Sequence, residues 1–118
     1  HARFRYWMDH CSKIASPLIQ TSLIEVLYSG PGKSEPFDRL LYTNPALLCV
    51  EYSLANVLKE MGIQPDFLMG YSLGEIIAAV VSGAISLEDG IEFVVDMATI
   101  VEQKDQQADM LAIMESKK

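Results

Sequence analysis

Residues 70–75 read Gly-Tyr-Ser-Leu-Gly-Glu, and this stretch constrains the fold more than any other part of the sequence. A short apolar run at 67–69 precedes it, and a helix-like apolar run at 76–81 follows it. A strand, then Gly-x-Ser-x-Gly, then a helix is the sequence pattern of a nucleophile elbow. Because such a turn is very tight, the two glycines on either side of the serine, Gly70 and Gly74, are predicted to be needed for their small size.

Ser72, at the centre of this turn, is the residue on which a functional interpretation rests. The turn is expected to hold its hydroxyl clear of the sheet. The N-terminus of the following helix would direct backbone N–H groups and a positive dipole end toward any oxyanion that forms there. The alternative is that Ser72 only caps the helix and carries no chemistry. The motif together with its flanking elements favours a serine nucleophile.

The size and charge of the chain restrict the classes of function. It has 118 residues, half of them hydrophobic, which suits one domain or a piece of one. It begins with His1 rather than Met, so we expect the natural N-terminus to be missing. No long apolar run and no signal-peptide pattern is present, so we expect a cytoplasmic protein that does not span a membrane. The net charge of −7 argues against nucleic acid and anionic membranes as partners.

Two patterns that could indicate a bound ion or phosphate are incomplete. Cys11 and Cys49 lie far apart, without a Cys-x-x-Cys motif or clustered histidines, so we expect buried, reduced thiols rather than a metal site or a disulfide. Residues 29–34 contain Gly-Lys-Ser, but the first glycine of a phosphate-binding loop would fall at Leu27, and no strand precedes it. We therefore predict no metal and no permanently bound cofactor.

Hydrophobic periodicity predicts helices over most of the chain. Residues 4–27 are predicted to be helical, with Pro17 as a break or a first-turn residue. Asn44 and Pro45 are typical of an N-cap and a first helical residue, and Gly62 is typical of the end of that helix.

The second half of the chain is predicted to alternate strand and helix. We expect a strand at about 66–71 that leads to Ser72, and a possible second strand at 110–115. Residues 86–89 read Ser-Leu-Glu-Asp, which resembles a capping box and predicts a helix over about 87–105. The fold class is therefore α/β, with helix predominating.

Three segments resemble the acyltransferase family of fatty acid and polyketide synthesis, that is, malonyl-CoA:acyl carrier protein transacylases and the acyltransferase domains of polyketide synthases. Residues 70–75 are similar to the family's Gly-His-Ser-x-Gly-Glu, and residues 43–47 to its Thr-Gln-Pro-Ala-Leu helix start. Residues 82–89 are similar to its Ala-Gly-x-x-Ser-Leu-Glu-Asp segment. The resemblance covers essentially all of residues 1–118 and implies a mostly helical fragment of the α/β-hydrolase-like subdomain of an acyltransferase fold.

The resemblance implies a mechanism that passes through an acyl-serine at Ser72. In the family a histidine base activates the serine. Two backbone N–H groups hold the oxyanion, one from the residue after the serine, here Leu73, and one from an N-terminal Gly-Gln-Gly loop. The implied substrate is an acyl-CoA or acyl-phosphopantetheine thioester, and the implied protein partner is an acyl carrier protein.

The chain departs from the family pattern in its catalytic groups. His1 and His10 both precede Ser72, no histidine follows it, and the Gly-Gln-Gly loop is absent. We expect His10 to be a solvated helix residue rather than a relocated base. Residues 1–118 are therefore interpreted as a partial acyltransferase domain that lacks the oxyanion loop and the histidine-bearing part. By itself this piece is expected to be inactive, because a serine without a base is a poor nucleophile.

Three further departures concern the predicted substrate pocket. Met97 stands where the family has an arginine that pairs with a malonyl carboxylate, and a thioether cannot compensate the desolvation of that charge. Lys104 lies seven residues further on, about 10 Å along a helix, which is too far to replace the arginine. Tyr71 replaces the histidine before the serine, and Asn44 replaces a glutamine that approaches the family's active site.

The sequence favours an acyltransferase homologue of a polyketide or antibiotic pathway, which hydrolyses or transfers neutral acyl groups on acyl carrier protein. The alternatives are a malonyl-type extender-unit acyltransferase and a catalytically degenerate scaffold. A general α/β-hydrolase esterase would need an acidic residue and a histidine after the serine. Unpaired sheet edges lead us to expect that the isolated piece dimerises or aggregates.

Overall fold

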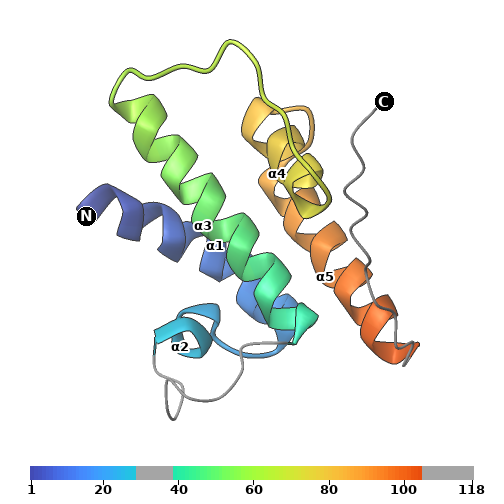
Figure 1. The fold of residues 1–118 in the computed structure, drawn as a ribbon. Coiled ribbons are helices and arrows are strands. Elements are labelled where there is room, and N and C mark those ends of the chain that lie inside the picture. The colour runs from blue at the N-terminus through green and yellow to red at the C-terminus, as the bar shows by residue number, and fades with distance from the viewer. Residues whose placement is uncertain (29–38, 105–118) are drawn as a thin grey trace, which may run out of the picture.

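The computed structural model describes residues 1–28 and 39–104, and all regular secondary structure in these ranges is helical (Figure 1). In chain order the helices are α1 (Ala2–Ile19), α2 (Leu23–Tyr28), α3 (Leu40–Glu60), α4 (Leu73–Ser82) and α5 (Leu87–Gln103). Helix α3 contacts each of the other four helices, and α4 and α5 lie side by side as an antiparallel pair. The buried core therefore forms around α3.

The core is built from apolar residues of all five helices, and its largest fully buried side chains include Met8, Leu23, Leu48 and Ile91. Cys11 and Cys49 are both free and fully buried there, which confirms the prediction of buried thiols. The neighbouring Cys11 thiol and burial both raise the pKa of the Cys49 thiol, so Cys49 is protonated at neutral pH. The thiols thus serve as small packing groups between α1 and α3.

Helix α1 ends at Ile19 rather than breaking at Pro17, which lies inside its last turn. Gln20 adopts a left-handed conformation (φ 58°, ψ 26°) and ends the helix. The hydroxyl of Ser16 then accepts a hydrogen bond from the Leu23 N–H at 3.1 Å, which joins α1 to α2. The predicted continuous segment is thus two helices, and the turn between them stops the first.

The prediction that α3 begins at Asn44 and Pro45 is wrong, because the helix begins at Leu40. The carboxylate of Glu102, on α5, accepts a hydrogen bond from the Leu41 N–H at 3.0 Å and another from Arg39 at 3.0 Å. These contacts satisfy a donor at the N-terminus of α3 that would otherwise lack a partner. The contact from α5 therefore stabilises an extra first turn that no local motif signals.

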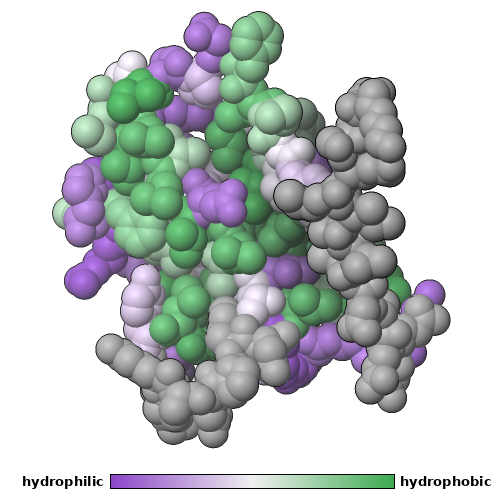
Figure 2. Space-filling view, viewed as in Figure 1, coloured by the Kyte–Doolittle hydropathy of each residue, from purple (hydrophilic) through white to green (hydrophobic). Residues whose placement is uncertain are grey.

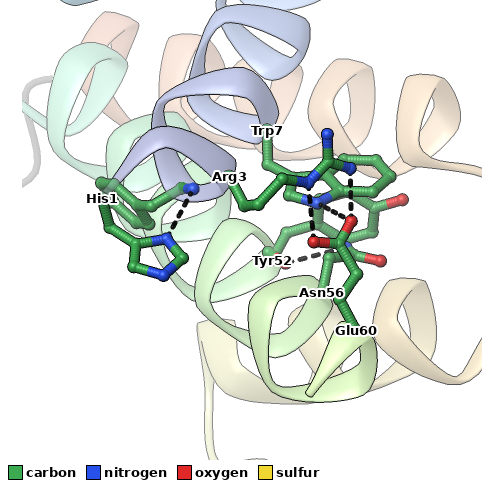
Figure 3. Close-up of polar contacts among 7 residues, drawn as sticks. His1, Arg3, Trp7, Tyr52, Asn56 and Glu60 are labelled. Carbon is green, nitrogen blue, oxygen red and sulfur yellow. Dashed lines mark hydrogen bonds and ion pairs between the residues drawn. The ribbon is translucent and has the colours of Figure 1, made fainter. Parts of the chain in front are cut away.

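The other end of α3 follows the prediction, since Gly62 takes a positive φ of 85° just after the last helical residue. The same end is tied to α1 by a polar cluster around Glu60 (Figure 3). The Glu60 carboxylate accepts hydrogen bonds from Arg3 Nε at 2.8 Å and from Trp7 Nε1 at 2.9 Å. The Arg3 guanidinium lowers the pKa of Glu60.

The strand predicted at 66–71 is not formed in the described structure, where this segment has no regular secondary structure. A strand exists only when its backbone pairs with a neighbour, and no such pairing is found among the described residues. The side chains of Phe67 and Met69 are almost fully exposed, and Figure 2 shows apolar residues gathered over α3 and the segment that follows it. The second predicted strand, 110–115, lies outside the described residues, and the self-association expected from unpaired edges stays a prediction.

Helix α5 agrees with its sequence signals. It begins at Leu87 with Ser86 as the N-cap, and the Ser86 hydroxyl accepts a hydrogen bond from the Asp89 N–H at 3.0 Å. No described helix is long and apolar enough to cross a membrane. Helices α4 and α5 approach closely at Gly90, where a Cβ atom would lie 2.3 Å from Val80 Cγ2. This close approach fixes the register of the two helices and so positions the site described next.

Candidate functional site

Ser72 has the most unusual backbone conformation in the described structure. Its φ of 54° and ψ of −123° lie outside the left-handed helical region that Gln20, the other described non-glycine residue with positive φ, adopts. Backbone strain of this kind costs about 1–3 kcal/mol and gathers at functional sites. Two hydrogen bonds hold the turn, from the Gly74 N–H to the Tyr71 carbonyl at 2.9 Å and from the Glu75 N–H to the Ser72 carbonyl at 3.0 Å.

The side chain of Ser72 does not act as a helix cap, although the residue occupies the N-cap position of α4. Its hydroxyl makes no capping hydrogen bond, and the residue is exposed. The simple capping role therefore does not explain this serine. Leu73 is the first residue of α4, and the first N–H groups of a helix have no partner within the helix.

The two glycines of the motif differ in their steric roles. A Cβ atom on Gly70 would lie 2.0 Å from the Gly74 carbonyl oxygen and 2.4 Å from the Glu75 nitrogen, so only glycine fits. A Cβ atom on Gly74 would meet nothing within 4 Å in the described structure. The prediction that both positions need glycine is therefore correct for Gly70 and wrong for Gly74 on steric grounds.

A cavity of about 260 Å³ opens beside Ser72 between α3, α4 and α5. Its lining consists of Asn44, Ser72, Leu73, Ile76, Phe93, Val94 and Met97. The structure thus brings together four residues that the sequence analysis singled out: Asn44, Ser72, Leu73 and Met97. Among the described residues that line it, Asn44 and Ser72 contribute the polar side chains, and none carries a charge.

Phe93 is a cavity residue that the sequence analysis missed. It lies four residues before Met97 on α5, so the two side chains share one face of the helix. That spacing was the available signal, because a pocket that contains Met97 must extend along the same face. The positions of the cavity walls on α3 and α4 could not be read from α5 alone.

Tyr71 is not brought into this cavity. Its side chain is 87% exposed and lines a different groove, which Gly70, Gly74 and residues of α3 and α4 complete. Lys104 caps the C-terminus of α5 and does not line the cavity. Tyr71 therefore lies next to Ser72 in sequence without sharing its pocket.

Neither histidine lies at the Ser72 cavity. His10 is exposed on α1, as predicted, with its ring 6.1 Å from that of Trp7. The Nδ1 atom of His1 accepts a hydrogen bond from the Phe4 N–H at 3.4 Å at the start of the same helix. Within residues 1–28 and 39–104, no three His, Cys, Asp or Glu side chains gather in a way that could hold a metal ion.

The comparison with protein families concerns the whole chain. The model of the acyl transferase domain family matches residues 1–118. The chain belongs to this family. The acyl transferase domain of ZmaA, a solved structure, gives a TM-score of 0.80 at 32% sequence identity. That match covers 87% of this chain and 24% of the other chain, and it shows that the helices described above take the arrangement of an acyl transferase domain.

Two bacterial relatives are similar over almost the full length of this acyl transferase chain. The polyketide biosynthesis acyltransferase homolog PksD of Bacillus subtilis is 42% identical over 114 residues, which cover 95% of this chain and 35% of PksD. The polyketide biosynthesis acyltransferase homolog BaeD of Bacillus velezensis is 46% identical over 115 residues, which cover 97% of this chain and 36% of BaeD. The chain therefore spans about a third of the length of these relatives.

Proposed function

We propose that Ser72 is the nucleophile of an acyl transfer reaction that passes through an acyl-serine. The observation that carries this proposal is the strained backbone of Ser72 at the start of α4 (φ 54°, ψ −123°), where the residue is exposed and its hydroxyl makes no capping hydrogen bond. The surrounding structure maintains this strain through the close approach of Gly70 to Gly74. Strain is retained where function requires it, and a capping serine would need none.

In the proposed first step, Ser72 Oγ attacks the carbonyl carbon of an acyl thioester. The C–O ester bond forms, the C–S bond breaks, and the departing thiol takes up a proton. In the second step, a carrier thiol or water attacks the ester and releases the serine. The same acyl-enzyme thus supports either transfer or hydrolysis, and the acceptor decides between them.

The residues around the cavity suggest which group would stabilise the oxyanion and which would accept the serine proton. The Leu73 N–H, at the first turn of α4, is proposed to donate to the oxyanion, where the helix dipole adds a favourable potential. The base that takes the serine proton is proposed to come from outside the described residues, because neither His1 nor His10 lines the cavity. The reaction is therefore proposed for the protein at its natural full length.

A neutral acyl group is the substrate class that fits the cavity best. Apart from Asn44 and Ser72, the described lining residues are apolar and none is cationic, and Met97 stands on α5 where the resemblance places an arginine. Burying a carboxylate in such surroundings without a partner is strongly unfavourable. A neutral acyl chain instead gains about 0.8 kcal/mol for each methylene that it buries.

The pathway proposed is polyketide biosynthesis, with an acyl carrier protein as partner and an acyl-CoA or acyl-phosphopantetheine thioester as substrate. The names of PksD and BaeD, which place those proteins in polyketide biosynthesis, support this assignment. A malonyl-type extender-unit transferase is the second candidate, because the resemblance of residues 43–47, 70–75 and 82–89 extends to malonyl-CoA:acyl carrier protein transacylases. The two candidates differ in the charge of the acyl group.

Intact-mass measurement separates the candidates. The full-length protein is incubated with acetyl-, butyryl- and malonyl-carrier protein, and the mass added to it is followed over time. We expect acetyl or butyryl adducts that disappear in the Ser72→Ala variant, and little malonyl adduct. Fast malonyl loading would favour the extender-unit candidate, and a folded protein that no thioester acylates would indicate a degenerate scaffold.

A further inference from the structure

Phe93 forms part of the Ser72 cavity without belonging to the hydrophobic core. Its side chain is 48% exposed and lines the cavity, whereas the next residue, Val94, is buried in the core. A large aromatic side chain that lines a cavity but packs only partly can change the cavity's size with little effect on the fold. This combination points to a role in what the cavity accepts.

The register of α4 and α5 shows where along the cavity Phe93 lies. The two helices run antiparallel (Figure 1), and Gly90 lies directly against Val80. Counting residues away from that contact in opposite directions places Phe93 level with Ile77, the neighbour of the cavity residue Ile76, and Met97 level with Leu73. Met97 comes four positions after Phe93 on α5, which is a distance of about 6 Å along the helix axis.

Met97 therefore lies at the Ser72 end of the cavity, and Phe93 lies one helical turn further away. An acyl group attached to Ser72 Oγ that entered this cavity would pass Met97 first and reach Phe93 with its distal carbons. The wall opposite Phe93 includes Ile76, which is also apolar. The distal end of the cavity thus offers shape but no polar group with which to select a substrate.

The volume of the cavity sets the scale of the group it can hold. An apolar cavity of about 150 Å³ accepts benzene, so a cavity of 260 Å³ has room for roughly ten non-hydrogen atoms. This is enough for a short or medium linear acyl chain, and a longer chain would have to pass Phe93 at the distal end. An apolar wall discriminates between homologous chains by size alone, at about tenfold or more for each methylene it rejects.

We infer that Phe93 is a specificity-determining residue that limits the length of the neutral acyl chain carried by Ser72. This inference rests on the proposed acyl-serine function. It assigns the two ends of the cavity separate roles, because Met97 borders the carbonyl end and Phe93 closes the distal end.

The test compares chain-length profiles of acylation in the full-length protein. Carrier-protein thioesters of acetyl, butyryl, hexanoyl and octanoyl groups are supplied in turn, and the rate of adduct formation is measured by intact mass. The variants are Phe93→Ala, which enlarges the distal end, and Phe93→Trp, which fills it. The matched control is Ile100→Ala, because Ile100 is also 48% exposed on α5 and does not line the cavity.

We expect Phe93→Ala to raise the ratio of octanoyl to butyryl loading by about tenfold or more, and Phe93→Trp to lower it by a similar factor. Ile100→Ala should leave the ratio unchanged. Circular dichroism melts confirm that each variant is folded, and the opposite directions of the two Phe93 variants separate a size effect from general damage. Loading with an unaltered profile in both Phe93 variants would overturn this inference alone, whereas no loading by any thioester would overturn the proposed function and this inference with it.

Discussion

The N-termini of α4 and α5 have nearly the same sequence and different structures. Helix α4 begins with Ser-Leu-Gly-Glu from Ser72, and α5 begins with Ser-Leu-Glu-Asp from Ser86. Ser86 has an extended backbone (φ −69°, ψ 160°), and its hydroxyl caps the Asp89 N–H at 3.0 Å. Ser72 has a strained backbone (φ 54°, ψ −123°) and caps nothing. The same two residue types therefore form a structural cap in one place and present a free hydroxyl in the other.

The residue two positions before each serine accounts for much of this difference. Gly70 precedes Ser72, and its missing Cβ lets the incoming chain lie against the Gly74 carbonyl. The corresponding residue before Ser86 is Ala84, which carries a Cβ atom and whose N–H donates to the Ala79 carbonyl at 2.9 Å. A Ser-x-x-acid pattern is thus not sufficient evidence for a capping box, and the residues before the serine must be included.

The largest expected effect is on activity, and it should differ sharply between variants of Ser72 and of Ser86. Replacing Ser72 with alanine should abolish acyl-enzyme formation, with a loss in turnover on the order of 10⁵-fold or more, because the nucleophile is removed. Replacing Ser86 with alanine should leave acylation close to that of the unmodified protein, since Ser86 lies at the far end of the α4–α5 pair. Adduct formation by intact mass measures both, and normal acylation of Ser72→Ala would show that this serine is not the nucleophile.

The next effect concerns the two glycines of the Ser72 turn. We expect Gly70→Ala to destabilise the fold by about 3 kcal/mol, because its methyl group would overlap backbone atoms that cannot move aside. Gly74→Ala should be neutral or stabilising by up to about 1 kcal/mol, since the space is open and alanine favours a helix. Urea unfolding of the two variants compares them directly, and equal losses would mean that Gly74 is also constrained by something outside the described residues.

The smallest expected effect is on stability. Here replacing Ser86 should have the larger effect and replacing Ser72 the smaller one, the opposite of their effects on activity. Ser86→Ala should cost about 1 kcal/mol of unfolding free energy, because the cap on Asp89 is lost. Ser72→Ala should change this free energy by less than about 0.5 kcal/mol, because no cap is lost. Thermal melts of the two variants at equal concentration provide the measurement. A larger loss for Ser72→Ala would indicate that its hydroxyl has a structural partner.

Much of the site could be predicted from the sequence because its signals are local. The motif at 70–75 marks the turn, and the resemblance to the acyltransferase family singled out Asn44 and Met97, two further residues that the structure places at the same cavity. Phe93 could have been added from its helical spacing to Met97. The placement of the Tyr71 side chain could not be predicted from the sequence, because it depends on how the strained turn is oriented between α3 and α4.

Errors in the predicted fold have a common cause. The start of α3 was misplaced because Glu102, 61 residues away from Leu41, supplies the hydrogen bond that stabilises the first turn. The strand at 66–71 was predicted from composition, but a strand also needs a paired neighbour, which the described residues do not include. In both cases the deciding hydrogen-bond partner belongs to a distant segment.

The sequence by itself determined the features whose causes lie within a few residues: the need for glycine at position 70, the cap of α5 by Ser86 and the end of α3 at Gly62. The tertiary structure decided where α3 begins and which side chains share a cavity with Ser72. The physical reason is the range of the interactions. Caps and tight turns are completed by neighbouring atoms along the chain, whereas a cavity wall or a capping carboxylate from another helix exists only after the helices have packed.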